Sequence, residues 1–311
     1  MDAVTTVALP VFALVGSGYA ARALRLLDAP SIVGLNGFVY WFALPALLFV
    51  RIAETKILGA FDARLVAAWL AASLFVFAVA MLVGRLVFGH GLARLGLQGL
   101  TATFGNVGYM GLPLVLTAFG RDATLPAVVI LVTDIVVIVP VAVAIVEAGR
   151  GRGGRFTTVA RTMLLGLATN PIVLASLAGA LVAAGGARVP APLRAFGELL
   201  GAAALPCALF ALGASLVGRL VAAGHRGAIA LVGLKLVLHP VAVWMIAAHL
   251  IPLDPLSARV AVIEASLPTA ATVFVLAQRY GLDVEGTSTA VLLSTVASVV
   301  TVSVLLALAT S

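Results

Sequence analysis

Charged residues are scarce in this chain. Only 10% of its 311 residues are Asp, Glu, Lys or Arg, whereas 63% are hydrophobic, and the mean hydropathy is +1.21. A water-soluble core of this length does not require such a composition. The scarcity of charge excludes an ordinary soluble domain, and the sequence predicts an all-α polytopic membrane protein.

Cysteine and histidine are scarce as well. Cys207 is the one cysteine in the sequence, which excludes an intrachain disulfide and a cysteine-based metal cluster. His90, His225 and His249 fall in or near predicted loops, and the sequence contains neither His-Glu-x-x-His nor a paired-Asp motif. A membrane-embedded enzyme is therefore the weaker alternative, and no cofactor is expected.

Ten apolar runs of about 20 residues match the thickness of a bilayer. They lie at approximately 4–26, 31–50, 64–88, 97–119, 123–147, 160–184, 195–217, 227–250, 257–278 and 286–309. The first run has Asp2 and no basic residue before it, so we expect a retained helix and not a cleaved signal peptide.

The basic residues are dispersed over the predicted loops, a pattern that does not favour nucleic acid binding. Eleven of them follow odd-numbered spans and seven follow even-numbered spans. Because cytoplasmic loops carry the excess of Lys and Arg, the odd loops are predicted to be cytoplasmic, with both termini outside the cytoplasm. Residues 149–159 are predicted to be a cytoplasmic basic linker between two halves, 1–148 and 160–311.

The two halves share a pattern of prolines. Pro10 and Pro45 are 35 residues apart, as are Pro171 and Pro206. The pairs Leu112-Pro113 and Leu267-Pro268 also correspond, in the fourth and ninth spans. Self-similarity at a half-chain period indicates an internal repeat. Since each half holds five helices, the second copy must be inverted relative to the first.

The fourth predicted span is interrupted by helix-breaking residues. The segment contains Asn106, Gly108, Tyr109, Gly111 and Pro113. Glycine weakens a helix and proline removes an N–H, so we expect unwinding over residues 105–113. Broken membrane helices persist where they are buried in protein or line a cavity, which predicts a substrate site. The alternative is that the glycines mark tight helix packing.

The ninth span carries a similar interruption at Ser266, Pro268 and Thr269. We predict that these residues share the substrate site with the fourth span, although a lone proline can also be a simple kink. Asn170 immediately precedes Pro171, so we expect it to satisfy local backbone groups.

Three ionisable residues lie far from the ends of the predicted spans, namely Asp134, Lys235 and Glu264. His239 lies four residues after Lys235, on the same helix face. Charges inside a membrane are expensive and mark functional sites. Two acids and one lysine leave one negative charge uncompensated, so we predict that Glu264 or Asp134 binds a coupling ion, H⁺ or Na⁺, while Lys235 balances charge or attracts substrate. A structural ion pair with a neutral buried carboxyl is the alternative.

These residues together resemble the auxin efflux carrier family, which includes plant PIN-type auxin exporters and bacterial malonate-transporter-like proteins. The match covers essentially the whole chain. It rests on Asn106-x-Gly-x-x-Gly-x-Pro113, Asn170-Pro171, Leu205-Pro206 with Leu209-Phe210 and Gly213, Lys235 with Pro240, and Leu267-Pro268 followed by Leu276-Ala-x-x-Tyr-Gly281.

The resemblance implies ten helices in two inverted five-helix repeats, with helices four and nine crossing at Pro113 and Pro268. Helices one, two, six and seven resemble a scaffold that dimerises, and the others a transport domain that moves as an elevator. The implied substrate is a small organic anion whose carboxylate lies near Asn106. The short central loop resembles that of a bacterial protein of the inner membrane, and it makes auxin a poor candidate substrate.

Other functions stay open at this level. A channel or a sensor built on a transporter fold are alternatives, but paired broken helices in inverted repeats favour alternating access. The substrate could also be a bulkier amphipathic anion of the bile-acid kind. Membrane lipid, the organic anion, H⁺ or Na⁺ and a second copy of the chain are the expected partners.

Overall fold

The computed structural model describes residues 9–54, 62–150, 168–217 and 226–310. Within these ranges the chain forms helices and one isolated β-bridge. The α-helices are α1 (Leu9–Ala23), α2 (Ala29–Phe38), α3 (Leu44–Ala53), α4 (Ala63–Leu86), α5 (Leu92–Thr103), α6 (Leu112–Phe119), α7 (Thr124–Thr133), α8 (Val139–Gly149), α10 (Pro171–Ala184), α11 (Ala191–Ala202), α12 (Ala204–Leu216), α13 (Arg226–Gly233), α14 (His239–Met245), α15 (Pro255–Ala265), α16 (Ala271–Tyr280) and α17 (Val284–Thr310).

Among the described residues, six helices are long and apolar enough to cross a membrane. They cover Ala29–Ala53, Ala63–Leu86, Arg121–Gly149, Ala191–Leu216, Arg226–Leu250 and Val284–Ala309. Each coincides with one of the predicted spans, which confirms a polytopic membrane protein. The predicted spans at 97–119 and 257–278 are instead divided between α5 and α6 and between α15 and α16. The predicted linker and the start of the predicted span at 160–184 lie mainly outside the described residues.

Asp and Asn side chains begin several of these helices. Asp28, Asp62 and Asp254 accept hydrogen bonds from backbone N–H groups in the first turns of α2, α4 and α15. Asn170 does the same for α10, accepting from Ile172 and Val173, as its position before Pro171 predicted. Because the first N–H groups of a helix lack intrahelical partners, these caps fix where the helices start.

Prolines widen the long helices locally. The described residues contain five π-helical turns, each of which ends two residues before a proline; the turns are Val39–Ala43, Val107–Gly111, Asp134–Ile138, Leu234–Leu238 and Ile246–Leu250. In each, the residue just before the proline donates its N–H to a carbonyl five residues back. Proline lacks an N–H and clashes with the carbonyl four residues earlier, so in the first four cases the wider turn lets the helix continue. The fifth turn, Ile246–Leu250, ends its helix.

This behaviour corrects the expected unwinding over residues 105–113. The backbone is non-helical only from Phe104 to Asn106, and the residues from Val107 to Gly111 form a π-helical turn that leads into α6. Pro113 follows this turn inside the half-helix, and the wider turn accommodates its ring and its missing N–H. The glycines therefore do not unwind the chain beyond Asn106.

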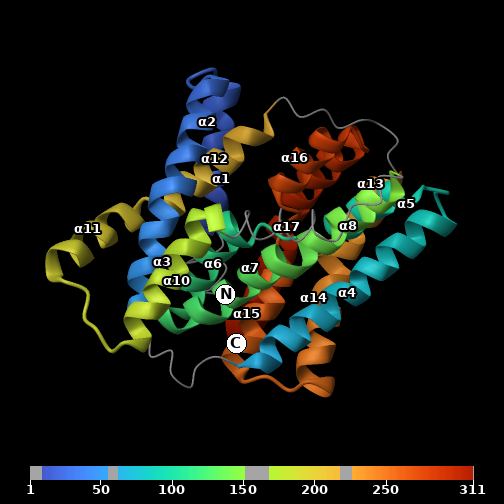
Figure 1. Ribbon diagram of the computed structural model, residues 1–311. Helices are drawn as coiled ribbons and strands as arrows, with labels where there is room; N and C mark the ends of the chain where they lie inside the picture. The colour runs from blue at the N-terminus through green and yellow to red at the C-terminus, as the bar shows by residue number, and fades with distance from the viewer. Residues whose placement is uncertain (1–8, 55–61, 151–167, 218–225, 311) are drawn as a thin grey trace.

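The helices pack in two groups (Figure 1). The first group comprises α1 to α3 and α10 to α12, in which α1 packs on α12 and α3 packs on α10 and α11. The second group comprises α4 to α8 and α13 to α17, with contacts such as α4 with α5, α5 with α8 and α14 with α15. The groups meet mainly where α12 packs on Val107–Gly111 and where α3 packs on α7.

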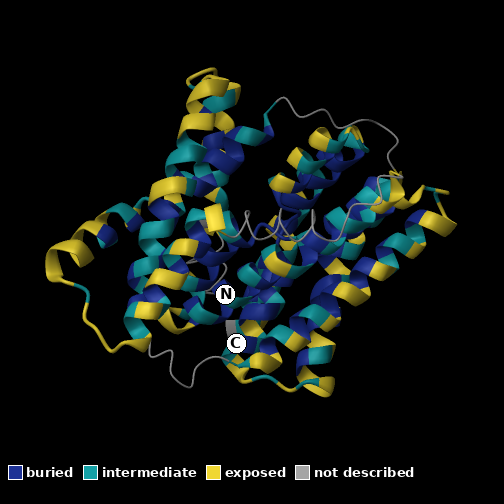
Figure 2. Ribbon diagram, in the orientation of Figure 1, coloured by how far each residue is buried: buried dark blue, intermediate teal, exposed yellow. Residues whose placement is uncertain are grey.

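Exposed residues lie on the outward faces and at the ends of the helices, and buried residues lie on the faces turned toward other helices (Figure 2). Large exposed residues such as Trp41, Phe75 and Leu199 are apolar. An apolar outer surface of this kind suits contact with lipid chains.

Glycines allow α1 and α12 to pack backbone to backbone. A Cβ atom on Gly18 would overlap the carbonyl oxygen of Phe210, and one on Gly213 would overlap that of Val15. The pair is reciprocal, since each helix offers a glycine to a carbonyl of the other. Small residues bring membrane helices close in this way.

We predict that Gly213→Ala destabilises the protein. Alanine favours a helix over glycine by about 1 kcal/mol, but overpacking against the Val15 carbonyl costs about 1–3 kcal/mol. The net expectation is a free energy of unfolding lowered by up to about 2 kcal/mol, measured by thermal or denaturant unfolding of the detergent-purified protein. Gly37→Ala is the matched control, because a Cβ there meets nothing within 4 Å. Equal stability of the two variants would contradict the packing.

Candidate functional site

The two interrupted helices meet inside the second group. The extended residues after α5 and those after α15 form an antiparallel bridge between Gly105 and Thr269. This bridge joins segments that are more than 160 residues apart in the sequence. It brings together the two breaks that the sequence predicted in the fourth and ninth spans.

Two backbone hydrogen bonds hold the breaks to each other. The N–H of Asn106 donates to the carbonyl of Pro268 at 2.9 Å, and the N–H of Ala270 donates to the carbonyl of Phe104 at 3.0 Å. In the membrane interior, no water is available to satisfy a freed backbone group. Each break therefore supplies partners that the other one needs.

Glycine is required where the breaks come closest. A Cβ atom on Gly105 would lie 3.2 Å from the carbonyl oxygen of Glu264 and 3.3 Å from the Lys235 ammonium nitrogen. A Cβ atom on Gly111 would overlap the Glu264 carboxylate and lie 2.6 Å from a methyl carbon of Leu267. The first break thus packs directly on the end of α15 and its acidic side chain.

Asn106 stands at the start of the half-helix Val107–Phe119. Its main-chain carbonyl accepts from the N–H groups of Met110 and Gly111, at 3.0 and 3.1 Å. Its side-chain amide makes no capping bond, and the residue is 6% exposed. The first turn of a helix offers unpaired N–H groups and a partial positive charge. Together with the amide, they can bind a carboxylate.

The predicted substrate residues fall into two sets. Gly108 and Tyr109 are partly exposed next to Asn106, and open space surrounds the position that a Gly108 Cβ would take. Gly111, Pro113 and Pro268 are buried. Only the first set lies where a ligand can arrive from outside the packed interior.

The hydroxyls of the second break hold the backbone. Ser266 donates to the carbonyl of Ile263 at 2.7 Å, and Thr269 donates to the carbonyl of Thr101 at 2.8 Å. The N–H of Thr269 donates to the hydroxyl of Ser294 on α17 at 3.1 Å. Both Ser266 and Thr269 are buried. Sequence reasoning named neither Thr101 nor Ser294, although α17 is rich in buried Ser and Thr.

Lys235 is fully buried and ties a π-helical turn to the second break. Its ammonium donates to the carbonyl of Ala265, the last residue of α15, at 2.6 Å, and lies 3.1 Å from Nδ1 of His239. Nε2 of His239 lies 3.1 Å from the hydroxyl of Ser73 on α4. A cation at the C-terminal end of a helix is favourable. The predicted pair Lys235 and His239 is therefore part of a chain that reaches Ser73.

The two buried acids differ in their partners. Oδ1 of Asp134 accepts a hydrogen bond from the indole N–H of Trp69 at 2.7 Å. Oδ2 of Asp134 and both carboxylate oxygens of Glu264 have no hydrogen-bond partner among the described residues. Trp69 and Ser73 lie one turn apart on α4, and sequence reasoning missed both because each is an ordinary residue of an apolar helix.

The described ranges contain no group of three or more His, Cys, Asp or Glu side chains that could hold a metal ion. The predicted Na⁺ site near Glu264 would therefore have one carboxylate and would need its other ligands from hydroxyls and carbonyls.

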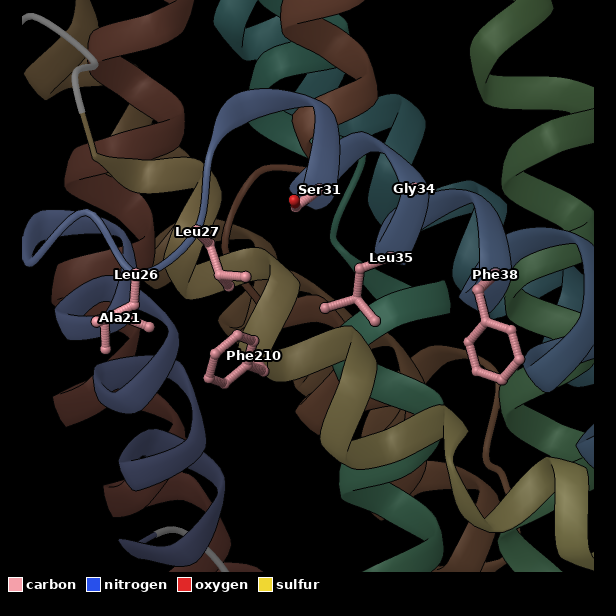
Figure 3. Close-up of a pocket in the computed structure, with 8 residues that line it drawn as sticks. All are labelled: Ala21, Leu26, Leu27, Ser31, Gly34, Leu35, Phe38 and Phe210. Carbon is pink, nitrogen blue, oxygen red and sulfur yellow. The ribbon is translucent and has the colours of Figure 1, made fainter.

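A separate groove lies between α1, α2 and α12, in the first group (Figure 3). Its volume is about 650 Å³, and Leu27, Leu35 and Phe210 point toward one another in it. Ser31 is the one polar side chain that lines it. Because the rest of its lining is apolar, this groove does not suit a small anion.

Comparison with known proteins identifies the family of the chain. The profile of a family described as "Membrane transport protein" matches residues 3–306. A Rhizobium meliloti protein named "Putative malonate transporter" is 34% identical over 98% of this chain and 96% of its own length. An uncharacterized transporter of Methanocaldococcus jannaschii is 23% identical, with 96% of each chain covered. One of Methanothermobacter thermautotrophicus is 26% identical, with 95% of each covered. The chain belongs to this family of membrane transport proteins, the auxin efflux carrier and malonate-transporter-like family that its motifs resemble.

Proposed function

We propose that the protein is a secondary active transporter of a small organic anion, a mono- or dicarboxylate of malonate size. The observation that carries the proposal is the meeting of the two breaks, with the uncapped Asn106 amide at the start of a half-helix. Half-helix starts at the centre of a transporter bind anionic substrate groups. The name of the Rhizobium relative supports a malonate-like substrate.

The proposed mechanism is alternating access of the elevator type. The first helix group would be the scaffold and the second the moving transport domain, in a chain of ten membrane helices arranged as two inverted repeats. The limited contact between the groups supports this division. Arg121, which precedes α7, forms one of the links, a 3.2 Å ion pair with Glu54 after α3. Exposed ion pairs are weak and would not oppose movement.

The proposed location is the inner membrane of a bacterium, with both termini outside the cytoplasm and the segment 149–159 inside. The excess of basic residues in the odd-numbered loops supports this orientation. A homodimer formed through the scaffold is part of the proposal. The apolar outer faces of the first group supply surface for that contact and for lipid.

The buried charges are proposed to couple transport to an ion. Asp134, Glu264 and Lys235 are buried. Glu264 and Lys235 lie at the second break, and Nδ1 of His239 lies 3.1 Å from the ammonium of Lys235. Lys235 balances the two acids, and the remaining negative charge calls for H⁺ or Na⁺. Buried charges are tolerated when they are paired, and they are expensive otherwise.

The first test is the exchange of labelled malonate by Asn106→Ala in proteoliposomes. Loss of a hydrogen bond to a charged group costs about 1.5–3 kcal/mol, so the KM should rise about tenfold or more. Asn36→Ala is the matched control, since the Asn36 amide donates to Ile32 in its own helix at 3.0 Å.

An unchanged KM in folded Asn106→Ala protein would refute the site. The absence of saturable exchange with any small carboxylate in the wild type would refute the carrier. Saturable exchange of bulky amphipathic anions alone would favour the competing substrate class, and flux that rises linearly with concentration would favour a channel.

The charge balance predicts the effect of Lys235→Met on stability. Removing one partner from a buried charge group costs about 3–5 kcal/mol, so this variant should unfold far more readily than Arg64→Met, which removes an exposed charge. Adding Asp134→Asn to Lys235→Met should restore part of the loss, because it removes the carboxylate that is left without a cation. Thermal unfolding of the purified variants measures both effects. A double variant no more stable than Lys235→Met would show that the two charges do not balance.

A further inference from the structure

We propose that the coupling ion is a proton and that the Glu264 carboxyl carries it. This inference rests on the proposed function. It chooses H⁺ over Na⁺ and assigns one carrier among the buried acids.

The Glu264 carboxylate forms no hydrogen bond or ion pair among the described residues. Its side chain is fully buried, and neither carboxylate oxygen has a hydrogen-bond partner among the described residues. The ion pairs formed within that part of the chain do not include it. An ionised carboxylate in such a place is strongly unfavourable. Asp134 differs, since the indole N–H of Trp69 stabilises its charge, so the proton belongs on Glu264.

The surroundings of Glu264 suit a proton better than Na⁺. Its carboxylate packs on the backbone of Gly111, and a methyl carbon of Leu267 lies close to the same point. A hard cation requires several oxygen ligands, whereas the described ranges contain no group of three or more His, Cys, Asp or Glu side chains that could hold a metal ion. A proton requires only the carboxylate oxygen.

The other titratable groups around Glu264 are few. Lys235 and Asp134 act on it electrostatically, and His239 reaches it through its contact with Lys235. Of the elements packed on α15, α6 and α7 carry no ionisable side chain. The others carry theirs at helix ends or at positions at least partly exposed: the arginines of α4, Arg121 and Asp122 before α7, Glu285 of α17, and Tyr109. The charge of the buried cluster is therefore set by four side chains.

Proton binding at Glu264 should favour anion binding at Asn106. With a proton on Glu264, the charges of Lys235 and Asp134 cancel; without it, the cluster carries a net negative charge against Gly111, in the first turn of the anion-binding half-helix. In the step itself, a carboxylate oxygen takes a proton from water on one side and returns it to water on the other. Because linkage is reciprocal, the bound anion in turn favours the proton.

The test uses full-length protein in sodium-free proteoliposomes, with the membrane potential clamped. An inward proton gradient should drive accumulation of labelled malonate by the wild type, and an internal dye should report proton entry with it. In Glu264→Gln, exchange of malonate at equal pH should persist within about twofold, while gradient-driven accumulation falls about tenfold or more. Glu264→Asp should recover part of the accumulation that the proton gradient drives. Glu198→Gln, an exposed acid of α11, is the matched control and should retain both activities.

Accumulation by Glu264→Gln equal to that of the wild type would overturn the assignment. So would wild-type accumulation driven by a sodium gradient and not by a proton gradient, a result that does not depend on the folding of any variant. If the wild type exchanges malonate but a proton gradient does not change its accumulation, this inference is refuted and the proposed function is not. Wild-type protein that exchanges no small carboxylate would refute the proposed function and this inference with it.

Discussion

The structure depends on one constraint, that backbone polar groups inside a membrane must find partners within the protein. Each interrupted helix alone would leave backbone groups without partners, and the two breaks supply partners to each other. The bonds from Asn106 to Pro268 and from Ala270 to Phe104 convert two unsatisfied breaks into one short antiparallel pairing. Side chains can then approach this pairing from both halves of the chain.

Proline determines where the buried charges stand. The π-helical turn before Pro140 begins at Asp134, and the turn before Pro240 contains Lys235. A widened turn redirects the side chains that precede it, and such turns are frequent at functional sites. Proline therefore does more here than kink helices. It fixes the positions of the widened turns that carry Asp134 and Lys235.

Much of this arrangement could be predicted from the sequence. The scarcity of charged residues identified a polytopic membrane protein, and Pro113 and Pro268 indicated the two breaks. The predicted extent of the first break was wrong, because a π-helical turn accommodates Pro113 without unwinding the chain. The partners that complete the site, such as Trp69 and Ser294, could not be predicted. Their roles arise from contacts between distant helices, and nothing in their local sequence distinguishes them.

The most direct measurement of the central claim is an experimental structure of the protein bound to malonate. The account predicts density for the dicarboxylate at the Asn106 amide, against the first turn of the half-helix Val107–Phe119 and beside Tyr109. Density for malonate elsewhere, for example in the groove between α1, α2 and α12, with none at Asn106, would contradict it.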